Sequence, residues 1–271
     1  MNDKTAVGVF GANGRMGRSL IEAVTGDEDV SLSCAFVRPD STLAGIDAGT
    51  LIGHAPMGTL LTCHTAEYND ATEVFIDFTL PEALAGHIQW CRKQRKAMVI
   101  GTTGLNERQL ALIDEAAADI PIVFAPNMSV GVNLMINLLQ TAAEVIGHQC
   151  DIEIVEAHHR FKQDAPSGTA MKFGEVIADK LNRNLSEVAV YGRQGIEAQR
   201  SRETIGFSTI RAADIVGEHT VMFADMGERL EITHKATSRL TFAKGGIRAA
   251  KWIKDKPAGL YDMQMVLGLK D

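Results

Sequence analysis

Short apolar runs alternate with helical patterns over roughly the first 127 residues of the chain. The apolar runs predict five strands, at residues 6–10, 32–37, 74–78, 97–100 and 122–124. Strands separated by helix-length segments are typical of a parallel sheet with crossover helices. Several of these strands stop at turn and cap residues, in the segments GANGRMG, FTLPE, GTTGLNE and APNMS. Because open parallel sheets bind ligands beyond the carboxyl ends of their strands, these turns are predicted to surround one crevice.

The second half of the chain has a different pattern. Apolar and polar positions alternate first in DIEIVEAHH, from Asp151, and then over residues 204–236, where Gly-containing turns break the runs. This alternation predicts a second sheet, mostly antiparallel or mixed. Ala170, Phe173, Ile177 and Leu181 fall near a helical period and predict a covering helix, while residues 242–253 and 259–269, with Trp252 and Leu260 as anchors, have helix-like patterning. The expected fold class is α/β: a Rossmann-like parallel-sheet domain and an α+β C-terminal domain.

A glycine-rich motif follows the first predicted strand and precedes the helical run RSLIEAV. It reads Gly11-Ala12-Asn13-Gly14-Arg15-Met16-Gly17. Gly14 would let the backbone approach a pyrophosphate, Gly17 would allow close packing of helix and strand, and the helix N-terminus would stabilise the anionic charge. The strand, turn and helix context favours a dinucleotide site over a plain tight turn.

The second predicted strand ends at Val37-Arg38. Dinucleotide folds usually place an Asp or Glu here to bind the ribose hydroxyls. A guanidinium at this position can bind a 2′-phosphate instead. The alternative, of equal weight, is a solvated surface arginine.

Two further turns are predicted to face the same crevice. Gly101-Thr102-Thr103-Gly104 follows a buried strand, and its small residues would let a flat ring lie against the backbone. Asn106 is the predicted cap of the next helix, with Gln109 in the capping-box position. An ordinary strand-to-helix turn is the alternative. The backbone of Ala125-Pro126-Asn127-Met128 could also point toward the crevice.

Residues that can transfer protons or bind anions are most concentrated in the segment EAHHRFKQDAPSGT, residues 156–169. His158, His159 and Lys162 precede a Pro-Ser-Gly-Thr turn that opens the predicted helix near Ala170. The free amides at that helix start, with the Thr169 hydroxyl and the Lys162 charge, form a natural carboxylate site. An imidazole can transfer a proton near neutral pH. A structural histidine or a zinc ligand is the alternative, although no matching acidic or cysteine ligand set supports zinc.

Composition narrows the possible partners and location. The net charge of −7 and pI near 5.6 argue against nucleic acids and anionic membrane surfaces. The four cysteines are scattered and are expected to be reduced thiols. A secretory signal pattern and an apolar run of membrane-spanning length are both missing from the sequence, so the expected location is cytoplasmic.

At EAHHRFKQDAPSGTA the sequence resembles the dihydrodipicolinate reductase family. GANGRMG, VFIDFT, MVIGTTG, APNMSVGVN and DIVGEHTVMFADMGERLEITHKATSR also lie in family order, so the resemblance spans nearly the whole chain. It implies a dinucleotide-binding domain of residues 1–128 and 240–271, and a substrate-binding domain of residues 129–239 whose sheet builds a homotetramer. The implied reaction is reduction of 4-hydroxy-tetrahydrodipicolinate, with loss of water, to tetrahydrodipicolinate on the route to diaminopimelate and lysine.

The resemblance also implies residue roles. His158 would be the proton donor and Lys162 a second donor, while His159, Gly168 and Thr169 would bind the small cyclic dicarboxylate. The cofactor, NADPH or NADH, would be lined by Gly11, Ala12, Asn13, Gly14, Arg15, Met16, Arg38, Gly101, Thr102, Thr103, Ala125, Pro126, Asn127 and Met128.

One departure from the family pattern concerns the cofactor. Many bacterial relatives carry an acidic residue where this chain has Val37, so NADPH is expected to serve at least as well as NADH.

Two other functions compete with this interpretation. One is another Rossmann reductase of amino or imino acids, similar to aspartate or homoserine dehydrogenase, and the other is a nonenzymatic NAD(P)H-sensing regulator.

Overall fold

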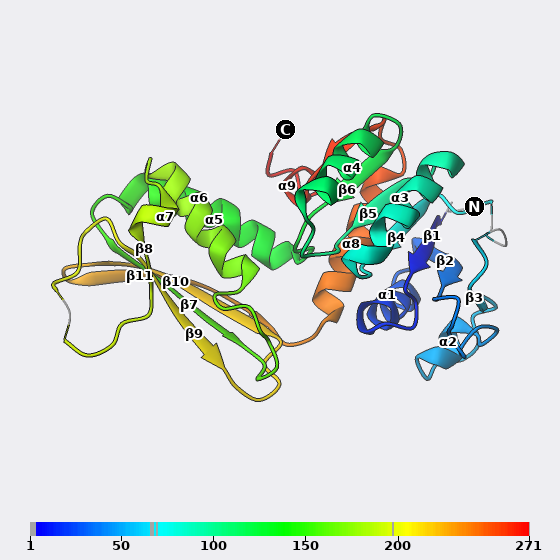
Figure 1. The fold of residues 1–271 in the computed structure, drawn as a ribbon, viewed down its shortest axis with the longest axis horizontal. Coiled ribbons are helices and arrows are strands. Elements are labelled where there is room, and N and C mark those ends of the chain that lie inside the picture. Colours follow the sequence, from blue (N-terminus) through cyan, green and yellow to red (C-terminus); the bar gives the residue numbers. More distant parts are fainter. Residues whose placement is uncertain (1–3, 66–67, 69, 197, 271) are drawn as a thin grey trace. The chain divides into compact units, whose positions relative to one another are not determined.

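The computed structural model describes residues 4–65, 68, 70–196 and 198–270. The chain folds into two compact units (Figure 1). Unit 1 comprises Met1–Val130 and Arg239–Asp271, and unit 2 comprises Gly131–Ser238.

Unit 1 contains a seven-stranded sheet in the order β12-β6-β5-β4-β1-β2-β3. All of its strand pairs are parallel, as predicted. The strands are β1 (Thr5–Phe10), β2 (Val30–Phe36), β3 (Leu61–Thr62), β4 (Val74–Asp77), β5 (Ala97–Ile100), β6 (Pro121–Phe124) and β12 (Gly259–Tyr261). β2 and β3 follow on one side of β1, and β4, β5 and β6 follow on the other, so the strand order reverses between β1 and β4. Such folds bind ligands at this point of reversal.

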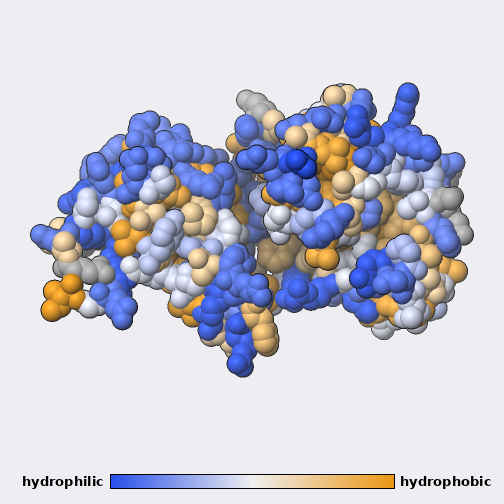
Figure 2. Space-filling view, in the orientation of Figure 1, coloured by the Kyte–Doolittle hydropathy of each residue, from blue (hydrophilic) through white to orange (hydrophobic). Residues whose placement is uncertain are grey.

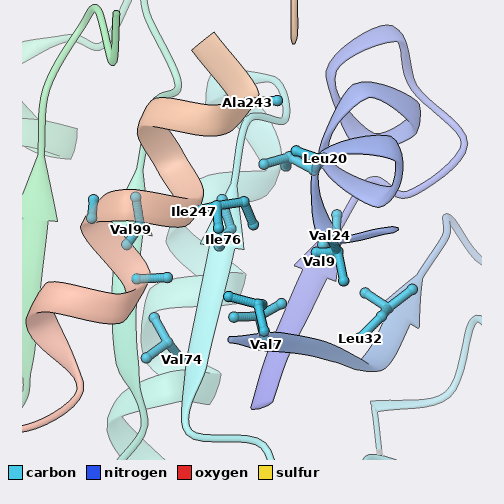
Figure 3. Packing of buried hydrophobic residues seen from close by; sticks show 14 of the residues in the cluster. Val7, Val9, Leu20, Val24, Leu32, Val74, Ile76, Val99, Ala243 and Ile247 are labelled. Atoms are coloured by element: carbon cyan, nitrogen blue, oxygen red, sulfur yellow. The ribbon is translucent and has the colours of Figure 1, made fainter. Parts of the chain in front are cut away.

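Helices cover both faces of this sheet. They are α1 (Arg15–Thr25), α2 (Ala48–Leu51), α3 (Pro81–Gln94), α4 (Glu107–Ala117), α8 (Leu240–Ile253) and α9 (Met263–Val266). Successive strand residues point to opposite faces. Val74 and Ile76 therefore pack with Leu20 of α1 and Ile247 of α8 (Figure 3), while Phe75 packs in the cluster that includes residues of α3 and α4. At the start of α4, Asn106 and Gln109 form the predicted capping box.

The predicted helix over residues 259–269 is wrong. Residues 259–261 form β12, in which Leu260 pairs with Ile122 of β6, and only the four residues of α9 are helical. The Tyr261 ring packs edge-on against Trp252, with ring centroids 5.2 Å apart. Leu260 is 41% exposed and is no anchor. A three-residue strand is too short to show a period, so the apolar residues of this segment imitated a helical pattern.

Unit 2 contains a mixed five-stranded sheet in the order β11-β10-β7-β9-β8. Its strands are β7 (Asp151–His158), β8 (Ala189–Tyr191), β9 (Ile205–Arg211), β10 (Gly217–Asp225) and β11 (Glu228–Ala236). β10 is antiparallel to β7 and β11, whereas β9 is parallel to β7 and β8. The parallel β7–β9 pair arises because a helical crossover, rather than a tight turn, connects these strands.

Two helices, α5 (Val130–Ile146) and α6 (Gly168–Lys180), pack on one face of the unit 2 sheet (Figure 1). The short helix α7 (Leu185–Val188) follows α6. Phe207 of β9 lies in the core with Leu139 and Phe173 of these helices. The neighbouring Ser208 and Ile210 point to the other face and are exposed in the single chain.

On the face drawn in Figure 2, hydrophilic residues predominate and hydrophobic residues lie interspersed among them. Among the described residues, no helix has both the length and the apolar character needed to cross a membrane.

Candidate active site

The glycine-rich turn of unit 1 depends on glycine at specific positions. Gly11 has a φ of +68°, which favours glycine. A Cβ on Gly17 would lie 2.2 Å from the Gly11 carbonyl oxygen, so the first turn of α1 packs directly on the loop. Gly14 is the N-cap of α1 and provides no side-chain cap to the helix amides. This helix start therefore suits an external anion.

The other residues of this turn connect it to the end of β2. The Ala12 amide donates to the Phe36 carbonyl over 2.9 Å, and the Asn13 side-chain amide lies 3.4 Å from the Ser41 hydroxyl. Arg15 is exposed and Met16 is half-buried against the core. The turn thus has a fixed backbone and side chains that reach solvent.

Arg38 lies at the end of β2 with a side chain that is 77% exposed. Its Nε atom lies 3.6 Å from a carboxylate oxygen of Asp40, whereas Val37 is buried. Position 37 thus has no acid, as the sequence shows, but Asp40 provides one two residues after the arginine. An exposed pair of this kind is weak, so Arg38 can exchange its partner for a phosphate.

A buried carboxylate connects two of the predicted turns. Asp77, at the end of β4, is 0% exposed. It accepts hydrogen bonds from the Thr79 amide at 2.8 Å and the Thr102 hydroxyl at 3.0 Å, and its other oxygen lies 2.6 Å from Nδ1 of His87. Burial raises the pKa of Asp77, but the hydrogen bond and charge of His87, with the Thr79 contacts, lower it below the ordinary value overall. Asp77 is therefore an ionised anchor for the turns after β4 and β5.

The turn after β5 has no room for a larger residue at its first position. A Cβ on Gly101 would lie 2.3 Å from the Phe78 ring, so this glycine packs directly on an aromatic side chain. Thr102 is buried on Asp77, while Thr103 and Gly104 are exposed. In the turn after β6, Ala125 and Met128 are buried, Pro126 is exposed and Asn127 is half-buried.

The dense polar segment of unit 2 is organised around Glu156. This side chain is 1% exposed, and one of its oxygens lies 2.5 Å from Nδ1 of His158. Arg211 of β9 donates two hydrogen bonds of 2.8 Å, one to each carboxylate oxygen. The Ser167 amide donates at 3.1 Å and the Thr209 hydroxyl at 3.3 Å. Burial raises the pKa of Glu156, but the hydrogen bonds and charges of His158 and Arg211 lower it to about 2.

The predicted carboxylate site surrounds the N-terminus of α6. Ser167 caps this helix by accepting from the Ala170 amide, and Gly168 is exposed with open space beside it. The Asp164 carboxylate lies 2.9 Å from Nζ of Lys162, and backbone amides that include that of Gly168 stabilise its charge. Burial raises the pKa of Asp164, while these contacts, Lys162 foremost, lower it overall. A carboxylate of the protein thus binds Lys162, one of the groups expected to bind a substrate carboxylate, next to the start of α6.

His159 and Thr169 flank this arrangement, and both are half-buried. The His159 ring lies 6.4 Å from the Phe161 ring. Lys162, at 23% exposure of its side chain, remains partly open to solvent. All five residues predicted for substrate and proton transfer therefore belong to the end of β7, the loop that follows it and the start of α6.

His219 of β10 is a buried member of this cluster. It is 4% exposed, with Nε2 lying 3.1 Å from the Ser167 hydroxyl and its ring edge-on to His158. Burial, and next the nearby charge of His158, lower the pKa of His219 to about 3, so it is neutral at physiological pH. His234, its partner across β10 and β11, also has a pKa lowered by burial.

Family models match both parts of the chain. Residues 5–128 match the model described as dihydrodipicolinate reductase, N-terminus, and residues 131–267 match the model for the C-terminus of the same protein. A protein of Hahella chejuensis named 4-hydroxy-tetrahydrodipicolinate reductase is 56% identical over 266 residues, which cover 98% of this chain and 100% of the relative.

Solved structures share the fold. The dipicolinate-bound dihydrodipicolinate reductase of Paenisporosarcina sp. TG-14 has a TM-score of 0.74 at 23% identity, covering 96% of this chain and 97% of that one. A probable dehydrogenase of Thermotoga maritima has a TM-score of 0.61 at 10% identity, covering 97% of this chain and 93% of that one. These likenesses support the two-part architecture described above.

Proposed function

This chain belongs to the dihydrodipicolinate reductase family, and from that membership we propose how its residues carry out the reaction. The reaction is the NAD(P)H-dependent reduction of 4-hydroxy-tetrahydrodipicolinate to tetrahydrodipicolinate, with loss of water, in diaminopimelate and lysine biosynthesis. The substrate is a small dicarboxylate and the cofactor is a nicotinamide nucleotide.

In the proposal, unit 1 holds the cofactor. The uncapped N-terminus of α1 at Gly14 would bind the pyrophosphate, and the turns anchored by Asp77 would support the rest of the nucleotide. The close packing at Gly17 fits this use, because it lets the first turn of α1 lie directly on the glycine-rich loop. When bound, the nicotinamide supplies the hydride.

In the proposal, unit 2 binds the carboxylates of the substrate. Lys162 contributes charge, while Gly168 and Thr169 contribute the first amides of α6, and His159 flanks them. The single observation that carries this assignment is the Asp164 carboxylate, which binds Lys162 beside the exposed start of α6. A substrate carboxylate that displaced Asp164 would find the Lys162 cation in place beside the first amides of α6.

His158 supplies the proton. Addition of hydride to a ring conjugated with a C=N bond leaves an electron pair on the ring nitrogen, which needs a nearby acid. Nδ1 of His158 is engaged by Glu156, so Nε2 is the nitrogen that faces this task. Lys162 is the second donor in the same loop.

Two substitutions test the proposed roles in proton donation and carboxylate binding. His158→Gln should lower turnover by about 100-fold or more while NADPH affinity stays unchanged, because only proton transfer is lost. Lys162→Ala should weaken binding of pyridine-2,6-dicarboxylate by roughly tenfold or more through loss of a charged hydrogen bond. Lys172→Ala is the matched control, since Lys172 is an exposed lysine of α6 paired with Glu175. Full activity of His158→Gln, or unchanged dicarboxylate affinity of Lys162→Ala, would refute the corresponding role.

The proposal includes three finer points. NADPH serves at least as well as NADH, because Val37 provides no carboxylate to repel a 2′-phosphate and Arg38 can bind one. The chain forms a homotetramer through the uncovered face of the unit 2 sheet, where Ile210 is 48% exposed. Its setting is cytoplasmic, as supported by four cysteines that are all free thiols.

A further inference from the structure

Glu156 contacts Nδ1 of the proposed proton donor His158 but has no assigned role in binding substrate or cofactor. Its carboxylate receives five hydrogen-bonding groups: Nδ1 of His158, both terminal nitrogens of Arg211, the Thr209 hydroxyl and the Ser167 amide. These groups come from β7, from β9 and from the residue that caps α6. One buried carboxylate therefore contacts both the proton donor and the start of the substrate-binding helix.

We propose that Glu156, held by Arg211, is the positioning residue of this active site: it fixes which nitrogen of His158 carries the transferable proton. This inference rests on the proposed role of His158. A carboxylate at Nδ1 requires a proton there, because it can only accept. The imidazole that remains after proton transfer is then the Nδ1–H form, and Nε2 is the atom that gives and regains the proton.

Arg211 fixes the orientation of the carboxylate in turn. A guanidinium that binds both oxygens holds the carboxylate plane, which a single hydrogen bond would not do. Arg211 also donates to the Asp164 carbonyl, so it connects Glu156 to the loop that carries Lys162. The charged and titratable groups that interact with Glu156 are His158, Arg211 and the buried His219.

Replacement of Glu156 by glutamine has a specific consequence. The oxygen Oε1 accepts from Ser167, Thr209 and Arg211, so the single amide oxygen of Gln satisfies most donors at that position. The amide nitrogen then faces Nδ1 of His158, which must accept rather than donate. The neutral Nε2–H form that results is a far weaker acid than an imidazolium.

The first experiment compares Glu156→Gln with wild type by turnover, by NADPH binding and by ¹⁵N NMR of the His158 ring. We expect turnover to fall on the order of 10²- to 10⁴-fold, with NADPH affinity within about twofold of wild type. The ring nitrogen signals should show Nδ1 changing from protonated to unprotonated. Glu156→Asp, which keeps the charge but is shorter, should recover part of the activity.

Glu153→Gln is the matched control. Glu153 lies on the same strand and also pairs with arginines, Arg193 and Arg200, but has no contact with His158. It should retain wild-type turnover. If Glu156→Gln keeps turnover within about threefold of wild type, or keeps Nδ1 protonated, the inference is wrong.

A double-mutant cycle separates positioning from general structural damage. If Glu156 acts through His158, adding Glu156→Gln to His158→Gln should lower turnover by less than about twofold further. A full additional loss in the double variant would contradict the inference. Full activity of His158→Gln alone would instead refute the proposed function, so the two failures are distinguishable.

A second variant covers loss of folding. Glu156→Gln leaves Arg211 without its counter-charge, and a one-sided removal of a buried pair is strongly destabilising. Glu156→Gln combined with Arg211→Met removes both charges. We expect this variant to fold, as shown by its circular dichroism, and to keep the same loss of turnover. A folded variant with wild-type turnover would overturn the proposal.

Discussion

The buried His219 predicts a measurable dependence of stability on pH. Its pKa falls from 6.5 to about 3 in the folded chain, chiefly because burial disfavours the charged form. Between these two values the unfolded chain binds the proton and the folded chain does not, so stability falls as the pH is lowered. The stabilising contribution is complete above pH 6.5 and is lost progressively toward pH 3.

The magnitude follows from the size of the shift. One pH unit within this window changes the free energy of unfolding by about 1.4 kcal/mol per group, so acidification from neutrality to pH 4.5 should cost about 2.5 kcal/mol through His219. Glu156 contributes little over this range: at pH 4.5, which is its ordinary pKa, it adds only about 0.4 kcal/mol, because its folded value is about 2. The charged or titratable groups that face His219 are His158, Glu156, His234 and Lys162.

The assay compares wild type with His219→Gln by guanidinium unfolding at a series of pH values from 7.5 to 4.5. Circular dichroism is the suitable probe because it reports on both units. Tryptophan fluorescence would report on unit 1 alone, since Trp90 and Trp252 both lie there, whereas His219 lies in unit 2. In His219→Gln, the free energy of unfolding should fall less steeply with decreasing pH than in wild type, whatever the stability of the variant at neutral pH. His148→Gln, at an exposed position, should keep the wild-type slope. Parallel pH curves for wild type and His219→Gln would refute the reasoning.

Three further predictions concern unit 1 and assembly. Gly17→Ala should destabilise the chain by about 1–3 kcal/mol and weaken NADPH binding, because its Cβ would meet backbone atoms. Gly86→Ala, at an open and exposed position of α3, should change neither property; thermal unfolding measures the stability and nucleotide titration the affinity. Arg38→Ala should weaken NADPH binding by up to about tenfold and leave NADH binding unchanged, and an equal loss of both would exclude a 2′-phosphate contact. Light scattering should give about four times the chain mass of 29.3 kDa, and a monomer mass would count against the proposed tetramer.

The sheet of unit 1 could be predicted because its strands are continuous apolar runs that end in turn residues. The two strands that were missed, β3 and β12, have only two and three residues, too few to show a period. Their place depends on pairing with β2 and β6 at the edges of the sheet. Such pairing is a property of the assembled sheet and leaves no local pattern.

The loop that carries His158, Lys162 and Gly168 could be identified because its residues are close in sequence. Glu156 was visible in the same segment, but its partner Arg211 is 55 residues away, and only the parallel pairing of β7 with β9 brings them together. The burial of His219 likewise depends on its pairing with Glu156 across β7 and β10. Alternation showed that β10 has two faces without showing which one carries the site.

Oxidation of NADPH by the purified wild-type chain tests the assigned reaction most directly. The substrate is generated in the cuvette from pyruvate and aspartate semialdehyde by the condensing enzyme. We predict that NADPH is consumed only when both precursors and the condensing enzyme are present, and that pyridine-2,6-dicarboxylate inhibits its consumption. Oxidation with aspartate semialdehyde alone, or no oxidation with the complete mixture, would contradict the assignment.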